Sequence, residues 1–140
     1  GLSAGGSLLD APAQQEPRTT VMIHNIPNTC TPEQLVEAWP HDGTYDLLYA
    51  PTSPGGRRVA GFVFVNFVSA AHAVAFKSLW HGSYLPAFRQ GRRLRLAWAH
   101  IQGFEANMEQ LRKRMGSLQR VGKHGFVVVD SVHYSGLGVV

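Results

Sequence analysis

The sequence predicts an α+β fold, in which short strands and helices alternate along a single domain. Residues 21–26 and residues 60–67 both alternate in side-chain character with a period of two, as strands with two different faces do. About forty residues separate the two segments, which leaves room for a helix and another strand between them. A helix is predicted to begin at 31–34, where an N-cap threonine, a first-turn proline and a capping-box glutamine occur together.

The composition indicates one globular domain with tails. The chain has 140 residues, of which 44% are hydrophobic and 16% are charged, whereas a disordered chain would be poorer in apolar groups. Cys30 is the only cysteine and cannot form an internal disulfide, so we expect an intracellular protein of the nucleus or cytoplasm. No apolar run is long enough to cross a bilayer, and we therefore expect no membrane contact.

The chain divides into four expected parts. Residues 1–17 are rich in Gly, Ala, Ser, Pro and Gln, which is typical of a disordered linker. Residues 18–101 form the domain, residues 102–117 form a helix packed on it, and residues 118–140 form a tail. Within the tail, residues 126–132 are rich in valine and could add an edge strand, a question that the sequence leaves open.

Two helices are expected within the domain. In the first, Leu35, Ala38 and Trp39 share one side at helical spacing. The second is capped by Ser69 and ended by Gly82, and its expected sheet-facing residues are Ala71, Val74, Ala75 and Leu79.

The strand at residues 45–49 has apolar residues on both sides. Strict alternation places Tyr45, Leu47 and Tyr49 on one side, and Asp46 and Leu48 on the other. Which side faces the core therefore stays open.

The strand at residues 60–67 carries aromatic rings on both faces. Phe62 and Phe64 share one face, while Val63, Val65 and Phe67 share the other. If the second face lies in the core, the first displays two neighbouring rings, an arrangement on which single-stranded RNA modules stack bases. The alternative is a strand buried on both faces, as in a parallel sheet.

The last strand of the domain, at residues 93–99, combines apolar and basic residues. Leu94 and Leu96 alternate with Arg93 and Arg95. With the leucines in the core, the two arginines would join the phenylalanine rings on the open face, and a basic cluster there suggests phosphate contacts.

The helix expected at residues 102–117 has an apolar stripe formed by Phe104, Met108, Leu111 and Met115. It could dock across the open face, covering the rings, or against the flank of the domain. We expect the flank, because Arg93 and Arg95 would otherwise be trapped beneath an apolar helix that offers no acidic partner.

Four segments resemble, in the same order, the C-terminal RNA recognition motif of the Mei-two-like meiosis regulators: residues 22–28, 43–51, 61–66 and 97–103. Within the aromatic octamer of that motif, five positions match, namely Gly61, Phe62, Phe64, Val65 and Phe67. Ala60 and Val63 depart from the octamer, and Met22 stands where the motif's hexamer usually has an aromatic residue. The resemblance implies a ferredoxin-like βαββαβ sandwich, a four-stranded antiparallel sheet with two helices on one face, that binds RNA. An amphipathic C-terminal helix would follow it.

The function that we expect is single-stranded RNA binding through the aromatic and basic sheet surface, in a regulatory module of a larger protein. The expected RNA-binding residues are Met22, His24, Asn25, Tyr49, Arg57, Arg58, Phe62, Phe64, Arg93 and Arg95. The alternative is a protein–protein interaction module on the same fold, which would suit Met22 and Ala60 in place of an aromatic and a basic residue.

The residues predict no catalytic, metal or cofactor site. The seven histidines never occur at ligand spacing with cysteines or carboxylates. No nucleophile, phosphate-loop or dinucleotide signature is present in the sequence. We therefore expect a monomeric binding module and not an enzyme, with single-stranded RNA as its partner and a protein as a second partner.

Overall fold

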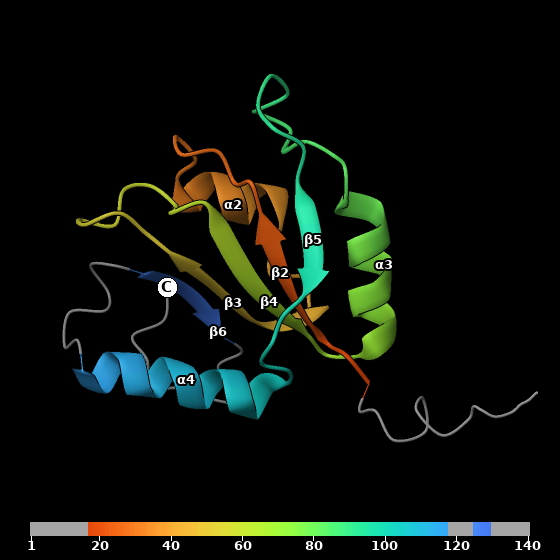
Figure 1. Ribbon diagram of the computed structural model, residues 1–140, viewed down its shortest axis with the longest axis vertical. Coiled ribbons are helices and arrows are strands. Elements are labelled where there is room, and N and C mark those ends of the chain that lie inside the picture. Colours follow the sequence, from red (N-terminus) through yellow and green to blue (C-terminus); the bar gives the residue numbers. More distant parts are fainter. Residues whose placement is uncertain (1–16, 118–124, 130–140) are drawn as a thin grey trace, which may run out of the picture.

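The computed structural model describes residues 17–117 and 125–129. Its elements, in chain order, are β2 (Thr20–His24), α2 (Pro32–Ala38), β3 (Tyr45–Pro51), β4 (Phe62–Phe67), α3 (Ala70–Trp80), β5 (Arg95–Trp98), α4 (Phe104–Ser117) and β6 (Gly125–Val129). The strands form one antiparallel sheet in the order β5-β2-β4-β3-β6 (Figure 1). The first six elements have the predicted βαββαβ order, and β6 adds a fifth strand at one edge. The expected linker, except Pro17, and most of the expected tail lie outside the described residues.

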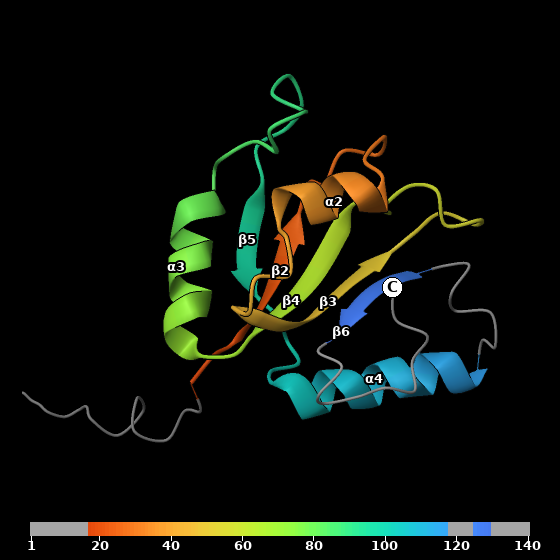
Figure 2. The ribbon, with the colours of Figure 1, turned by 180° about the vertical axis from the view of Figure 1, so that it is seen from behind.

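Helices α2 and α3 cover one face of the sheet, and the main core lies between them and the strands (Figure 2). Val63, Val65 and Phe67 of β4 are buried in this core, as the sequence predicts. The predicted capping box of α2 is confirmed, because Thr31 Oγ1 accepts a hydrogen bond from Gln34 N at 3.2 Å and Gln34 Oε1 accepts one from Thr31 N at 3.0 Å.

The side of α3 that faces the core differs from the prediction. Ala73 is buried and Phe76 and Trp80 pack on the core, whereas Val74 and Leu79 are exposed. The rings of Phe76 and Trp80 lie 5.6 and 5.5 Å from the ring of Trp39, which caps α2. Turning the two large rings inward buries more apolar area than the predicted set of smaller residues would, and this sets the rotation of the helix.

A β-bulge changes which residues of β3 lie on the same side of the sheet. The register of β3 against β4 shifts between Tyr45 and Leu47. As a result, Tyr45 faces the main core together with Leu48 and Ala50, while Leu47 and Tyr49 face the opposite side. Strict alternation placed Tyr45 on the same side as Leu47 and Tyr49, and this grouping is wrong because the bulge adds one residue to the strand.

Helix α4 lies on the second face of the sheet, over β3 and β6 (Figures 1 and 2). The buried contact between these elements consists of Leu47, Tyr49, Met108, Leu111, Val127 and Val129. Of the two positions considered, α4 takes neither in full: it lies on the open face and not on the flank, but over β3 and β6, so Phe62 stays outside the buried contact. Arg95 lies in β5, at the edge of the sheet opposite β6, so α4 covers apolar residues without trapping that charge. The side chain of Met115, expected in the same apolar stripe, lies outside the described part of the chain.

A polar network fixes the start of α4 on the sheet. Gln102 Oε1 accepts hydrogen bonds from the backbone N–H groups of Thr19 and Thr20, both at 2.9 Å, and Gln102 Nε2 donates to Thr20 O at 2.8 Å. Thr20 Oγ1 accepts a hydrogen bond from Gly103 N at 2.8 Å and donates one to Asn66 Oδ1 at 2.7 Å. The segment that leads into α4 is therefore tied to the start of β2 and, through Thr20, to Asn66 of β4.

Candidate nucleic-acid interface

Helix α4 leaves part of the second sheet face uncovered, and we call this surface the platform. It lies over β5, β2 and β4 and consists of Met22, His24, Phe62, Phe64, Arg95 and Ala97, each exposed or half-buried. Met22 lies opposite Phe64 and Ala97 in register, and His24 lies opposite Phe62 and Arg95. The antiparallel pairing thus gathers side chains from three separate stretches of the sequence.

Phe62 and Phe64 form the centre of the platform. Their ring centroids lie 5.6 Å apart and their planes meet at 86°, an edge-to-face contact. A planar ligand stacked on one ring therefore meets the edge of the other. Both rings are half-buried, on the opposite face of β4 from Val63 and Val65.

His24 is a neutral group beside a cation at one end of the platform. Burial, and after it the positive charge of Arg95, hold the pKa of His24 below its ordinary value of 6.5. The neutral imidazole is therefore the main form at pH 7, where it can stack or form a hydrogen bond. The positive charge at this position of the platform belongs to Arg95, which is exposed.

Arg93 and Asn25 were expected on the binding surface, but the structure gives both of them structural contacts. Arg93 Nη1 donates to Gly82 O at 2.9 Å, and its guanidinium carbon lies 4.9 Å from the ring centroid of Tyr84. Arg93 precedes β5, which begins at Arg95, and these contacts direct its guanidinium to the segment after α3. Asn25, at φ 71°, donates from Nδ2 to Arg93 O at 2.9 Å and so shapes the turn after β2.

Tyr49 was also expected to bind RNA, but α4 covers most of it. Its side chain is 9% exposed and packs with Leu111. The guanidinium carbon of Arg114 lies 6.0 Å from the centroid of the Tyr49 ring. A Cβ added at Gly125 would lie 2.8 Å from Tyr49 Cε1, so β6 approaches the Tyr49 ring closely at this point. Tyr49 therefore lies beside the platform, beneath α4, and not on its exposed part.

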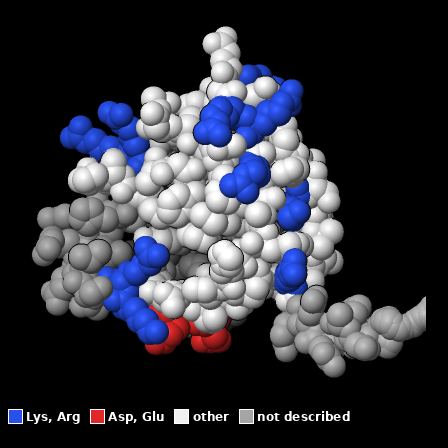
Figure 3. Space-filling model, in the orientation of Figure 1, with Lys and Arg blue, Asp and Glu red and all other residues white. Residues whose placement is uncertain are grey.

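Basic side chains occur at several places around the platform. In the view of Figure 3, Lys and Arg side chains lie on several sides of the molecule, whereas Asp and Glu side chains gather at one edge. Arg57 and Arg58 are exposed in the loop between β3 and β4, as expected. This loop is an ordered hairpin, in which Ser53 N donates to Arg58 O at 2.8 Å. The exposed basic residues of α4 are Arg112, Lys113 and Arg114.

The family model described as RNA recognition motif 2 matches residues 18–112, which include every element from β2 to β5 and most of α4. The chain belongs to the RNA recognition motif 2 family. The resemblance found in the sequence is thereby confirmed. The implied ferredoxin-like fold is confirmed as well, with five strands in the sheet in place of the four expected.

Curated relatives of this RNA recognition motif include two plant proteins. Protein MEI2-like 2 of Oryza sativa subsp. japonica is 39% identical over 88 residues, which are 61% of this chain and 10% of that protein. Protein MEI2-like 2 of Arabidopsis thaliana is 40% identical over 93 residues, which are 65% of this chain and 11% of that protein. The matched part is thus about a tenth of the length of these relatives.

Among solved structures, the Rna15 RRM with bound RNA (GU) superposes on this RNA recognition motif with a TM-score of 0.53. The match covers 69% of this chain and 99% of that chain, at 18% sequence identity. It shows that the two share a fold.

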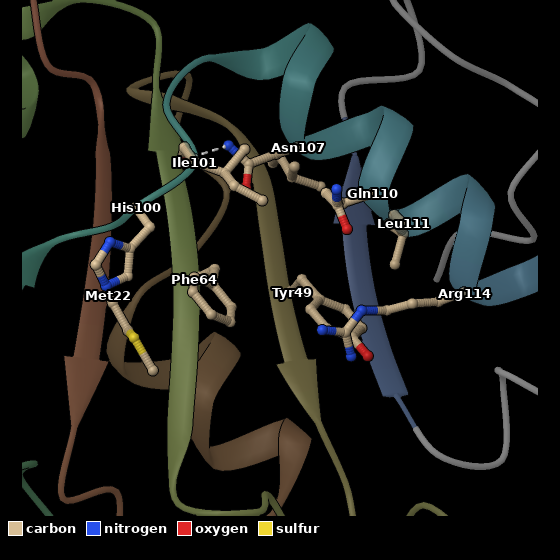
Figure 4. A pocket seen from close by; sticks show the side chains of 10 residues that line it. Met22, Tyr49, Phe64, His100, Ile101, Asn107, Gln110, Leu111 and Arg114 are labelled. Atoms are coloured by element: carbon tan, nitrogen blue, oxygen red, sulfur yellow. Dashed lines mark hydrogen bonds between the residues drawn. The ribbon is translucent and has the colours of Figure 1, made fainter.

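Between α4 and the sheet of this RNA recognition motif lies a pocket of about 260 Å³, which we call the α4 pocket (Figure 4). Phe64 and Tyr49 lie on the sheet side, and Gln110, Leu111 and Arg114 point toward them from α4. Sequence reasoning assigned no binding role to seven residues of its lining: Leu47, His100, Ile101, Asn107, Gln110, Leu111 and Arg114. The one available signal was the 97–103 segment, which matched the family but pointed to no site.

No group of three or more His, Cys, Asp or Glu side chains that could hold a metal ion occurs within residues 17–117 and 125–129. Across the same described ranges, none of the helices has both the length and the apolar character needed to cross a membrane.

Proposed function

We propose that this RNA recognition motif binds single-stranded RNA on the platform, as a regulatory module of a larger protein. The observation that carries the proposal is the pair of half-buried rings, Phe62 and Phe64, on a sheet face that also presents His24 and Arg95. Membership of the family supports it, and so does the shared fold with the Rna15 RRM, which was solved with RNA bound. A binding role, and not a catalytic one, agrees with this surface.

The platform favours single strands for a physical reason. A base must leave its helical stack before it can lie against Phe62 or Phe64, and bases in loops and single strands are already available. Stacking is tolerant of sequence because every base has a π face, so the two rings contribute affinity more than selectivity.

Arg95 is proposed to contact the phosphate backbone, with help from Arg57 and Arg58 at the end of the sheet. Each phosphate contact to a single strand releases counterions and contributes roughly 0.7 to the slope of log affinity against log salt. Replacing Arg95 by alanine should therefore reduce this slope, whereas Arg93→Ala should leave it unchanged because Arg93 is bound to Gly82 and Tyr84.

The test is a titration of labelled single-stranded RNA pools with wild type and the Phe62→Ala/Phe64→Ala double variant, followed by fluorescence anisotropy. Each lost stacking contact should weaken binding by about 1–3 kcal/mol. Leu79→Ala is the matched control, because Leu79 is an apolar side chain that is 70% exposed on α3, away from the platform. Equal affinity of the double variant and wild type would reject the platform as the binding surface.

A protein-binding role is the second candidate, and one observation favours it. Val74 and Leu79, at 51% and 70% exposure, are apolar side chains on the outer side of α3. Exposed apolar groups mark protein interaction sites where they form a contiguous patch. In this case Val74→Asp/Leu79→Asp would abolish capture of a partner from cell extract and leave RNA affinity unchanged. An equal yield of the partner with this variant would reject α3 as the docking site.

A further inference from the structure

We propose that the α4 pocket holds one unstacked base of the bound RNA strand, so that α4 forms a wall of the RNA site. The inference rests on the proposed RNA-binding function and adds to it a second kind of subsite. On the platform a base would stack in the open, whereas in the α4 pocket it would be enclosed between the sheet and the helix.

The α4 pocket is continuous with the platform. Met22 and Phe64 belong to both, so a strand that crosses the platform reaches the pocket without leaving the protein surface. Figure 4 shows Met22 and His100 on one side of Phe64, and Tyr49 with the side chains of α4 on the other. An RNA strand lying on Phe64 is therefore next to the pocket.

The size of the α4 pocket suits a single ring system. Its volume of about 260 Å³ is smaller than the roughly 300–1,000 Å³ of pockets that enclose drug-sized ligands. The lining is mainly apolar, with Leu47, Ile101 and Leu111 among its members, which matches the faces of a planar base. A dinucleotide would not fit inside, but one base with its sugar at the mouth would.

Polar groups on α4 can read the edge of such a base. The side-chain amide of Gln110 makes no hydrogen bond with any other residue that the structure describes. It offers both donors and an acceptor toward the pocket, the combination with which glutamine recognises base edges. Gln110 would therefore make the pocket selective among bases, which the rings of the platform are not.

The charge at the pocket favours a nucleotide over an apolar side chain of a protein. Arg114 lines the pocket and carries its guanidinium over the Tyr49 ring, where it can meet the phosphate attached to the enclosed base. No Asp or Glu is among the described residues of the lining. Tyr49 itself packs in the buried cluster with Leu111, so the wall that the base would meet is part of the fold.

Two measurements on the full chain test the inference. The first is the affinity for octanucleotides of adenosine, cytidine and uridine, at one salt concentration. For wild type, the affinities for the most tightly and the most weakly bound octanucleotide should differ by at least about fivefold. This is the low end of the discrimination that a well-placed pair of hydrogen bonds provides. Gln110→Ala should bring this ratio close to one. Phe62→Ala should weaken all three by a similar factor and preserve the ratio, because stacking tolerates any base.

The second measurement locates the base directly. With methyl-labelled protein and the tightest octanucleotide, nuclear Overhauser effects should connect base protons to the methyl groups of Leu111 and Met22. Arg114→Ala should also weaken binding more than Arg112→Ala, since Arg112 contributes the same charge from the same helix but lines no part of the pocket.

The outcomes separate the pocket from the platform. If the octanucleotides bind and Phe62→Ala weakens them, but Leu111 shows no contact and Gln110→Ala leaves the ratio unchanged, the pocket inference is overturned and the proposed function stands. If the wild type binds none of the three octanucleotides, both the pocket inference and the proposed function are rejected. If the pocket takes a protein side chain and not a base, the expected result is the first one, with RNA binding on the platform and no contact at Leu111.

Discussion

His24 lies opposite Arg95 in the β2–β5 register, and burial of His24, followed by the charge of Arg95, makes the stability of the folded protein sensitive to pH. The folded protein binds a proton at His24 more weakly than the unfolded chain does, because the pKa of His24 is lowered by burial and by Arg95. The stability that depends on neutral His24 is therefore complete above about pH 6.5 and is lost as the pH falls below that value.

Arg95→Gln should raise the pKa of His24 but leave it below 6.5, because burial, the larger cause, remains. A pH titration of the His24 ring protons by NMR measures this change. Arg92→Gln serves as the control, since Arg92 is exposed and lies outside the strand pairing. An identical titration curve in wild type and Arg95→Gln would show that the charge of Arg95 does not reach His24.

Gly125 is the residue at which β6 leaves no room for a side chain. A Cβ there would lie 2.8 Å from Tyr49 Cε1, and Tyr49 is itself enclosed by α4. We expect Gly125→Ala to lower the free energy of unfolding by about 1–3 kcal/mol, as overpacking does. Gly91→Ala is the matched control in chemical denaturation, because its nearest neighbour would be Phe88 O at 3.4 Å. Two variants of equal stability would argue against close packing of β6 on Tyr49.

At the scale of the secondary-structure elements, the position of α4 depends on the segment that precedes it. Gln102 uses both ends of its amide there, since Oε1 accepts from two N–H groups of the β2 start while Nε2 donates to Thr20 O and Ala99 O. Thr20 Oγ1 also receives a hydrogen bond from Asn107 Nδ2, at 3.3 Å. The first turn of α4 is therefore held in place by polar contacts before its apolar stripe meets the sheet.

Gln102→Glu tests this arrangement with almost no change in shape. The carboxylate keeps its acceptor but places a second oxygen against the carbonyls of Thr20 and Ala99, which lose their donor. We expect the free energy of unfolding to fall by about 1–3 kcal/mol. Gln110→Glu, the same exchange at an exposed position of α4, should stay within about 0.5 kcal/mol. Thermal and urea unfolding would compare the stabilities of the two variants. If Gln102→Glu were as stable as wild type, the apolar contact alone would position α4.

In the whole molecule, the two faces of the sheet have different roles. One face is closed by α2 and α3 over the main core, and the other is shared between α4, above β3 and β6, and the platform, above β4, β2 and β5. Because the strand order separates Arg95 from α4 by the width of the sheet, an apolar helix and a charged surface coexist on one face.

A chain that ends at Gly103 removes α4 and β6 together. Leu47 and Tyr49 would then be exposed, and burial of each large side chain contributes roughly 1.5–3 kcal/mol. We expect a lower melting temperature and weaker RNA binding, measured by calorimetry and fluorescence anisotropy on the same preparation. Tighter binding at an unchanged melting temperature would instead identify α4 as a competitor of RNA.

The sequence by itself determined the features that depend on neighbouring residues. The capping box at Thr31, the cap at Ser69 and the opposite faces of Phe64 and Val65 follow from local geometry, and each is confirmed. The family was evident from short motifs for the same reason, since each motif lies within one element and its turn.

Tertiary structure decided the features that depend on contacts between distant segments. A bulge turned Tyr45 into the core, the ring of Trp39 drew Phe76 and Trp80 inward, and the addition of β6 created the apolar strip on which α4 rests. None of these has a local signal, because the energy that selects each one comes from area buried against a partner far away in the chain. The same holds for the α4 pocket, because its walls come from β2, β3, β4 and α4, which only the fold brings together.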